Sequence, residues 1–315
     1  MASAGRKAMR GRLARATRVD ACGRVVYGEA SQAVSKGLIT VAWTMNSTES
    51  PAIEQENFNG DPCILEPAKT RFTSFSLVMT FCEVDPEFFS LVTGQRVILD
   101  AFGNAVGFAI STDVDLGDRG FALEVWTGAP RDTAACADPN AQGNFGYFLA
   151  PFLKGGVLGD YTIENGAITF TITGAVTQDG NAWGVGPYNV TLDASGDLSP
   201  LLTPLEANDH KQLIWVSVAP PEPFYGTRPV LDPDSTALTA VAAAEGASPT
   251  EAVFTFTGGT GEPVWIDFGD GEWDYVPLAS AGATHIYAKN GTYTPRASTN
   301  GTWVPVAAPI TIPFP

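Results

Sequence analysis

PVWIDFGDGEW, residues 263–273, decides how the C-terminal third of the chain folds. Its Asp267-Phe268-Gly269 string also marks the metal-binding loop of protein kinases. That loop works with a lysine strand, an H-R-D catalytic loop and a Gly-rich phosphate cover, and the sequence contains none of them. A calcium loop requires oxygen ligands at alternating positions that end in a bidentate glutamate, whereas Phe268 and Trp273 interrupt the acids here. The stretch therefore predicts a strand that ends in a tight turn.

Each residue of this turn has an expected structural role. Gly269 and Gly271 supply the turn conformation, and Asp270 accepts hydrogen bonds from nearby backbone amides. We expect Trp265 and Phe268 to pack inward. The predicted role of the stretch is structural.

A later segment, HIYAKNGTYT (285–294), completes a recognisable pattern. The two stretches resemble the W-x-F-G-D-G and H-x-Y-x-x-x-G-x-Y signature of PKD-type immunoglobulin-like domains. The matching residues are Trp265, Asp267, Gly269, Asp270, Gly271, His285, Tyr287, Gly291 and Tyr293. The resemblance implies that these residues form the fold without a catalytic role, and that His285 is a packed, hydrogen-bonded histidine.

The composition favours short strands joined by turns. The 315 residues include 33 Gly and 23 Pro, and only 17% are charged, so a mainly β chain with two domains is expected. No apolar run approaches 18 residues, and no apolar segment follows the basic N-terminus. We therefore expect no membrane insertion and no secretory signal.

The rest of the chain contains further strand patterns and one helix. The helix is DPEFFSLVTG (85–94), with Asp85 as its N-cap, Gly94 as its stop, and Phe88, Leu91 and Val92 on one face. Strands are predicted at 37–46, 72–84, 95–99, 105–112, 120–128, 145–153, 167–176, 187–192 and 210–219, and five more between 235 and 298. Residues 47–71 between the first two predict a long hairpin arm or an exposed contact loop.

These elements divide the chain into four parts. They are a basic N-terminal arm (1–18), a β domain with a flanking helix (19–219), a Pro-rich linker (220–234) and an immunoglobulin-like β-sandwich (235–315). The linker is expected to be semi-rigid, so that the last domain folds independently.

Charge is concentrated unevenly. Residues 1–24 hold seven of the 18 Lys and Arg but only one acid, Asp20, although the whole chain has a net charge of −16. The arm could be a transit peptide, a nucleic-acid tail or a flexible arm that orders against the acidic surface of a neighbouring copy. The acidic remainder has the wrong sign for gripping nucleic acid.

Residues capable of catalysis or metal binding are few. The chain has two histidines, His210 and His285, and four cysteines without a C-x-x-C pair, so we expect reduced thiols and no zinc site. Asp113, Asp115 and Asp118 could coordinate a cation, but acids in a turn between two strands commonly hold no metal, and we expect a turn. Trp126, Trp183 and Trp215 could form a sugar-binding platform, but we expect them to pack in the core. No carboxylate pair for glycoside hydrolysis can be placed. We predict no enzyme, no catalytic residues, no metal and no cofactor.

Long phrases of the first domain carry a second resemblance. TRVDACGRVVYG (17–28), FCEVDPEFFSLVTGQRV (81–97), GFALEVWTG (120–128) and QGNFGYFLAPFLKGGVLGDYTIENGAITFTITGAVTQDGNAWGVGPYNV (142–190) resemble the major tail, or tail tube, proteins of long-tailed actinobacterial bacteriophages. The resemblance implies a tail-tube-type β-sandwich or barrel that forms stacked hexameric rings, with the added domain facing outward. The Arg-rich extension before Thr17 is not part of that pattern.

The resemblance also implies partners and a location. The chain would assemble with itself in the host cytoplasm and reside in the virion tail, next to tape measure, tail terminator and distal tail proteins, with phage DNA passing transiently through the lumen. An acidic lumen would let DNA slide, although acidity could merely aid solubility. The alternative function is a secreted or surface carbohydrate-binding or adhesive module.

Overall fold

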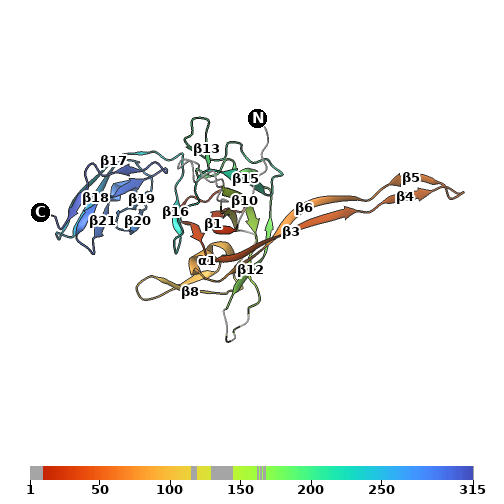
Figure 1. The fold of residues 1–315 in the computed structure, drawn as a ribbon, viewed down its shortest axis with the longest axis horizontal. Helices are drawn as coiled ribbons and strands as arrows, with labels where there is room; N and C mark the ends of the chain where they lie inside the picture. The colour runs from red at the N-terminus through yellow and green to blue at the C-terminus, as the bar shows by residue number, and fades with distance from the viewer. Residues whose placement is uncertain are drawn as a thin grey trace, which may run out of the picture. The chain divides into compact units, whose positions relative to one another are not determined.

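The computed structural model describes residues 10–114, 119–128, 145–161, 163, 165 and 168–314. This part of the chain is mainly β structure with one α-helix (Figure 1). The chain divides into two compact units, Met1–Val25 with Ala33–Gly226, and Val26–Gln32 with Thr227–Pro315. The second unit therefore takes a short segment from near the N-terminus, which the sequence did not predict.

The elements follow one another along the chain as short antiparallel strands. The N-terminal unit contains β1 (Gly11–Val19), β3 (Leu38–Ser50), β4 (Ile53–Glu56), β5 (Pro62–Glu66), β6 (Lys69–Phe81), α1 (Pro86–Thr93), β7 (Arg96–Leu99), β8 (Ala105–Ala109), β9 (Gly120–Thr127), β10 (Phe145–Lys154), β11 (Val157–Leu158), β12 (Phe170–Thr177), η2 (Asn181–Trp183), β13 (Thr191–Leu192), β14 (Leu198–Ser199) and β15 (Gln212–Val216). The C-terminal unit contains β16 (Arg228–Val230), β17 (Leu238–Glu245), β18 (Glu251–Gly258), β19 (Val264–Asp267), β20 (Trp273–Val276), η3 (Ala279–Ala281), β21 (Ala283–Ile286), β22 (Gly291–Tyr293), β23 (Arg296–Ser298), β24 (Val304–Pro305) and β25 (Ile310–Ile312), and β2 (Gly28–Ser35) contributes to both units.

The main sheet of the N-terminal unit has the order β1-β9-β10-β12-β6-β3. These strands pair antiparallel with their neighbours, and β15 also pairs antiparallel with β10. The described strands form no closed barrel, because β3 lies at an edge of the sheet. The expected mainly β class with one flanking helix is confirmed.

The N-terminal segment corrects one prediction. Residues 11–18 were expected to belong to a flexible arm, but they form most of β1, which pairs along its length with β9. Leu13 to Thr17 are buried. A strand that is buried in the sheet cannot be a free arm.

Both faces of the main sheet are covered. On one face, α1 and inward side chains such as Phe81, Leu123 and Leu153 form a core. On the other face, Trp126 and Tyr147 pack with the segment that contains Trp183 and Leu205. Two-sided burial explains why the central strands are apolar in almost every position.

The helix forms as its local signals predict. Asp85 accepts hydrogen bonds from the amides of Glu87 and Phe88, and Gly94 ends the helix at φ 72°. Phe88 and Val92 are buried and Leu91 is partly buried against the sheet. The helix also buries Phe89, which stacks on Phe108 of β8.

Two antiparallel sheets share the core of the C-terminal unit. Their orders are β17-β18-β21 and β20-β19-β23-β24, an arrangement consistent with a β-sandwich. Val264, Ile266 and Phe268 point into this core. The expectation for Trp265 was wrong, because alternation along β19 places its side chain on the opposite face, where it is half-buried.

Part of the Pro-rich segment is fixed to the N-terminal unit. Phe224 packs against the second core of that unit, the Tyr225 hydroxyl donates to Glu83, and the Gly226 amide donates to Asp85 over 2.8 Å. The segment expected to be a connector is therefore anchored up to Gly226.

Candidate assembly surfaces

The largest exposed feature of the N-terminal unit is a hairpin arm, defined here as residues 47–71. Pairing between β6 and β12 ends at Ser76, whereas pairing between β6 and β3 continues to Lys69 and Ser50, and β4 then pairs with β5. Figure 1 shows this two-stranded arm leaving the sheet. The sequence predicted either a hairpin arm or an exposed loop for these residues, and the structure shows a hairpin.

The arm presents apolar side chains to solvent. Its exposed large hydrophobic residues are Ile53, Phe58, Ile64 and Leu65, of which Phe58 is fully exposed. A two-stranded ribbon has no core in which to bury them. Apolar surface of this kind is typical of a contact with another molecule.

The arm ends in a rigid turn. The Asn57 side-chain oxygen accepts hydrogen bonds from the amides of Asn59 and Asp61, each at 2.9 Å, and Gly60 takes φ 81°. These bonds order the backbone of the turn that carries Phe58 at the tip. A backbone that is already ordered loses less entropy on binding than a flexible loop would.

The arm is acidic. It contains Glu49, Glu54, Glu56, Asp61 and Glu66 but only two basic residues, Lys69 and Arg71. Lys69 is already paired with Glu66 at 2.6 Å. The tip of the arm is therefore negatively charged.

A groove of about 550 Å³ lies between β1 and β3, where the curved sheet remains open. Val41, Trp43, Val125 and Phe148 are among the residues that form its apolar lining. β3 is an edge strand, so backbone groups along its outer side have no strand partner in the described part of the chain. A groove beside a free strand edge can receive another strand.

The groove has basic residues at its margin. Arg10 and Arg12 line it and are exposed, and no acidic residue lines it. Lys211 lies next to it, with its ammonium 4.1 Å from the centre of the Trp43 ring. Burial lowers the pKa of Lys211. The margin of the groove is thus positively charged, although the whole chain has a net charge of −16.

A second hairpin, β7 with β8, also exposes apolar side chains. Ile98, Leu99, Phe102 and Val106 are exposed. Its tip has the same hydrogen-bonding pattern as the tip of the arm. The Asp100 side chain accepts hydrogen bonds from the amides of Phe102 and Asn104, two and four residues further on, each at 2.8 Å. The hydrogen bond from the Asn104 side chain lowers the pKa of Asp100.

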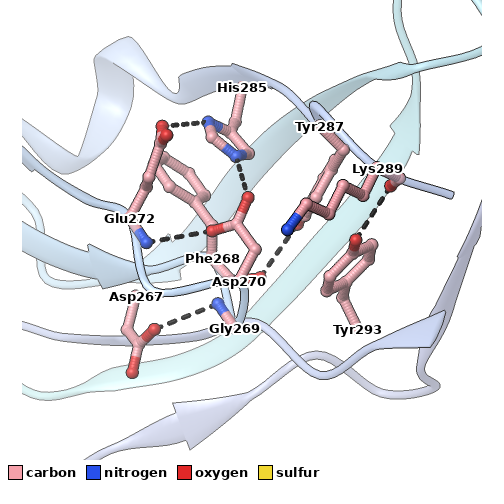
Figure 2. Close-up of polar contacts among 9 residues, drawn as sticks. All are labelled: Asp267, Phe268, Gly269, Asp270, Glu272, His285, Tyr287, Lys289 and Tyr293. Atoms are coloured by element: carbon pink, nitrogen blue, oxygen red, sulfur yellow. Dashed lines mark hydrogen bonds and ion pairs between the residues drawn. The ribbon is translucent and has the colours of Figure 1, made fainter. Parts of the chain in front are cut away.

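The Asp267-Phe268-Gly269 turn has the structural role that the sequence predicts (Figure 2). Asp267 accepts from the Gly269 amide and Asp270 from the Glu272 amide, both at 3.0 Å. Gly269 and Gly271 adopt φ 82° and 100°. The side chains of Asp267 and Asp270 therefore hold the backbone of the turn.

His285 is packed and hydrogen-bonded, as expected. Its ring stacks 4.0 Å from Phe268, and Nε2 lies 2.8 Å from Asp270 Oδ2 (Figure 2). Burial alone would raise the pKa of Asp270, but the hydrogen bonds from His285 and the Glu272 amide outweigh burial and lower it. Burial also raises the pKa of Tyr287, which donates to the Phe268 carbonyl.

A cluster of half-buried tryptophans outside the core of the C-terminal unit was not predicted. Trp265 lies 6.0 Å from Trp273 and 5.1 Å from Trp303, measured between ring centres. None of the three belongs to the core of this unit. Arg296 lies 4.7 Å above Trp303 and is bonded to Asp267 at 3.0 Å. Alternation along β19 could have revealed the outward position of Trp265.

The remaining candidate residues do not form a cation site or a sugar platform. Asp113 is exposed and bonded to Ser111, and Asp115 and Asp118 lie outside the described residues. Trp126 and Trp183 are buried in the core, which confirms their packing role, and Trp215 is half-buried.

The histidines and thiols are also scattered. His210 Nδ1 lies 3.2 Å from the Thr177 hydroxyl, far along the chain from His285. Cys22, Cys63 and Cys82 are free, and Cys136 lies outside the described residues. Within the described ranges, no group of three His, Cys, Asp or Glu side chains could hold a metal ion.

Comparisons with protein-family models and with curated protein sequences found no match. No helix among the described residues is long and apolar enough to cross a membrane. Function must therefore be argued from the surfaces of the chain itself.

Proposed function

We propose that the chain is a structural subunit of a bacteriophage tail tube. Copies form hexameric rings, the rings stack, and DNA passes through the central channel. The phrases between residues 17 and 190 that resemble tail tube proteins support this function. Its location is the virion tail, assembled in the host cytoplasm next to tape measure, terminator and distal tail proteins.

The arm is the single observation that carries the proposal. An exposed apolar ribbon and a long free edge on β3 both remain without a partner in the described chain. Association of identical copies would bury both, and closure into a ring would remove open edges. The C-terminal unit then serves as an outward decoration that aids weak host-surface binding through repetition.

Electron microscopy and light scattering of the full chain test this function. We expect rings or tubes with six subunits around. A variant in which Asn-Gly replaces residues 51–68 should fold but form no tubes, because Ser50 and Lys69 are already paired and a two-residue turn can join them. Hydrogen exchange of the main sheet should be unchanged in this variant. A full chain that stays monomeric in all conditions would refute the proposal.

The tryptophan cluster favours a second candidate function, a carbohydrate-binding or adhesive module. Aromatic rings outside a core can stack on sugar faces. A glycan screen of the full chain tests this function, and Trp303→Ala should lose any glycan binding that depends on the tryptophan cluster. Glycan binding without any self-assembly would favour this candidate over the tail tube.

A further inference from the structure

We propose that the groove between β1 and β3 is the receptor for the acidic arm of a second copy of this chain. This inference rests on the proposed self-assembly and assigns a specific docking site to it. Leu65 of β5 occupies the groove, and Glu54 and Glu56, which lie on the same face of the arm, meet Arg10 and Arg12.

Charge complementarity selects the occupant. The groove margin carries Arg10 and Arg12 without an acidic neighbour in its lining, whereas Glu54 and Glu56 are exposed on β4. Opposite charges at the edge of an interface steer association and fix its register. An acidic strand therefore fits this groove better than a basic or neutral one.

Apolar complementarity points to the same occupant. Trp43 and Phe148 are only half-buried in the groove, and Leu65, which pairs with Glu54 on the same face of the arm, is more than half exposed. Docking would remove both sets from water. The exposed fractions identify these residues as the apolar centre of the contact, with the charges around it.

Backbone geometry supplies the third argument. The outer side of β3 is a free strand edge at the groove, and the arm consists of strands. A strand of the arm can extend the sheet by pairing with β3, which places alternate side chains in the groove. Such docking cannot occur within one copy, because the arm begins from β3 itself and extends away from the sheet.

A charge-exchange experiment on the full chain tests the proposal. Arg10→Glu/Arg12→Glu and Glu54→Lys/Glu56→Lys should each weaken self-association by about tenfold at low salt, as followed by analytical ultracentrifugation. All four changes in one chain should restore association. Glu245→Lys/Asp274→Lys alters exposed residues of the C-terminal unit by the same net charge as Glu54→Lys/Glu56→Lys and is the matched control for that pair, expected to leave association unchanged.

A disulfide experiment locates the contact independently. With Cys22, Cys82 and Cys136 replaced by Ser, native Cys63 in β5 should cross-link to a partner's groove in an Ile39→Cys variant, because both positions are exposed. Ile110→Cys, exposed but outside the groove, is the matched control and should cross-link far less.

The outcomes separate the docking site from the proposed function. Normal tubes from both charge-reversed pairs, with no groove cross-link, would overturn the docking site and leave the tail-tube function standing. Charge-dependent dimers that never form rings would support the docking site and refute the tube. A wild-type chain that stays monomeric would overturn both.

Discussion

Arg15 and Glu124 face each other across β1 and β9 in the interior of the N-terminal unit. The Arg15 Nε and Nη2 atoms lie 2.5 and 2.6 Å from the two Glu124 oxygens, and the Tyr147 hydroxyl donates to the same carboxylate over 2.6 Å. Burial alone would lower the pKa of Arg15, but Glu124 raises it. This ion pair fixes the register of the two strands.

Arg15→Met should lower the free energy of unfolding by about 3–5 kcal/mol, because it leaves the Glu124 carboxylate buried without its charge partner. Urea unfolding of the full chain, with hydrogen exchange of β1 and β9 as readout, measures the loss. The double variant Arg15→Met/Glu124→Gln should lose less of the free energy of unfolding, because the uncharged glutamine side chain at position 124 can still accept the hydrogen bond from the Tyr147 hydroxyl. An equal or larger loss in the double variant would contradict this account.

The same pair explains why sequence alone misplaced residues 11–18. Alternation along this stretch puts Arg15 on the same side as Leu13 and Val19, yet a buried arginine is stable only with a partner. That partner, Glu124, lies 109 positions away, and no local pattern reveals it. An Arg-rich segment therefore looks like a solvated arm until the fold is known.

Local signals, in contrast, were sufficient elsewhere. The helix was predictable because its cap, first-turn proline and glycine stop all lie within residues 85–94. The arm was predictable only as a long segment between two strands, because β4 and β5 are exposed on both faces and so lack the apolar alternation of a strand that packs on a core. Trp265 was misplaced because Phe268 is three positions away, so period two puts the two side chains on opposite faces.

Removing the helix cap gives a second prediction. Asp85→Ala should destabilise the N-terminal unit by about 1–2 kcal/mol, because the amides of Glu87 and Gly226 both lose their acceptor. Hydrogen exchange of α1 measures the change. Asp85→Asn keeps an acceptor oxygen and should retain most of the stability, so an equal loss in both variants would rule out capping as the cause.

The His285–Asp270 contact predicts an acid-dependent stability of the C-terminal unit. The lowered pKa of Asp270 means that the unfolded chain binds more protons in acid. The stabilisation is therefore complete above the ordinary carboxyl pKa of about 4 and is lost as the pH falls through the lower folded value. Asp270→Asn should cost about 1 kcal/mol at pH 6 and progressively less below pH 4.

Pulsed hydrogen exchange of peptides from residues 264–293 along a urea series, at pH 6 and pH 3, measures this difference in the full chain. Asp274→Asn is the matched control, because Asp274 is exposed and its side chain bonds only the adjacent Tyr275 amide. A difference between wild type and Asp270→Asn that stays constant with pH would show that the charge of Asp270 contributes nothing.

A close backbone approach at Gly180 gives the last prediction. Gly180 is buried after β12, and an added Cβ would overlap the Pro151 ring and the Asp209 carbonyl oxygen. Backbone and ring atoms cannot move aside as a flexible side chain can. Gly180→Ala should therefore cost about 1–3 kcal/mol by overpacking, whereas Gly107→Ala, which has open space around its Cβ, should cost less than about 0.5 kcal/mol. Urea unfolding of both variants measures the contrast, and equal stabilities would mean that the loop after β12 can shift without cost.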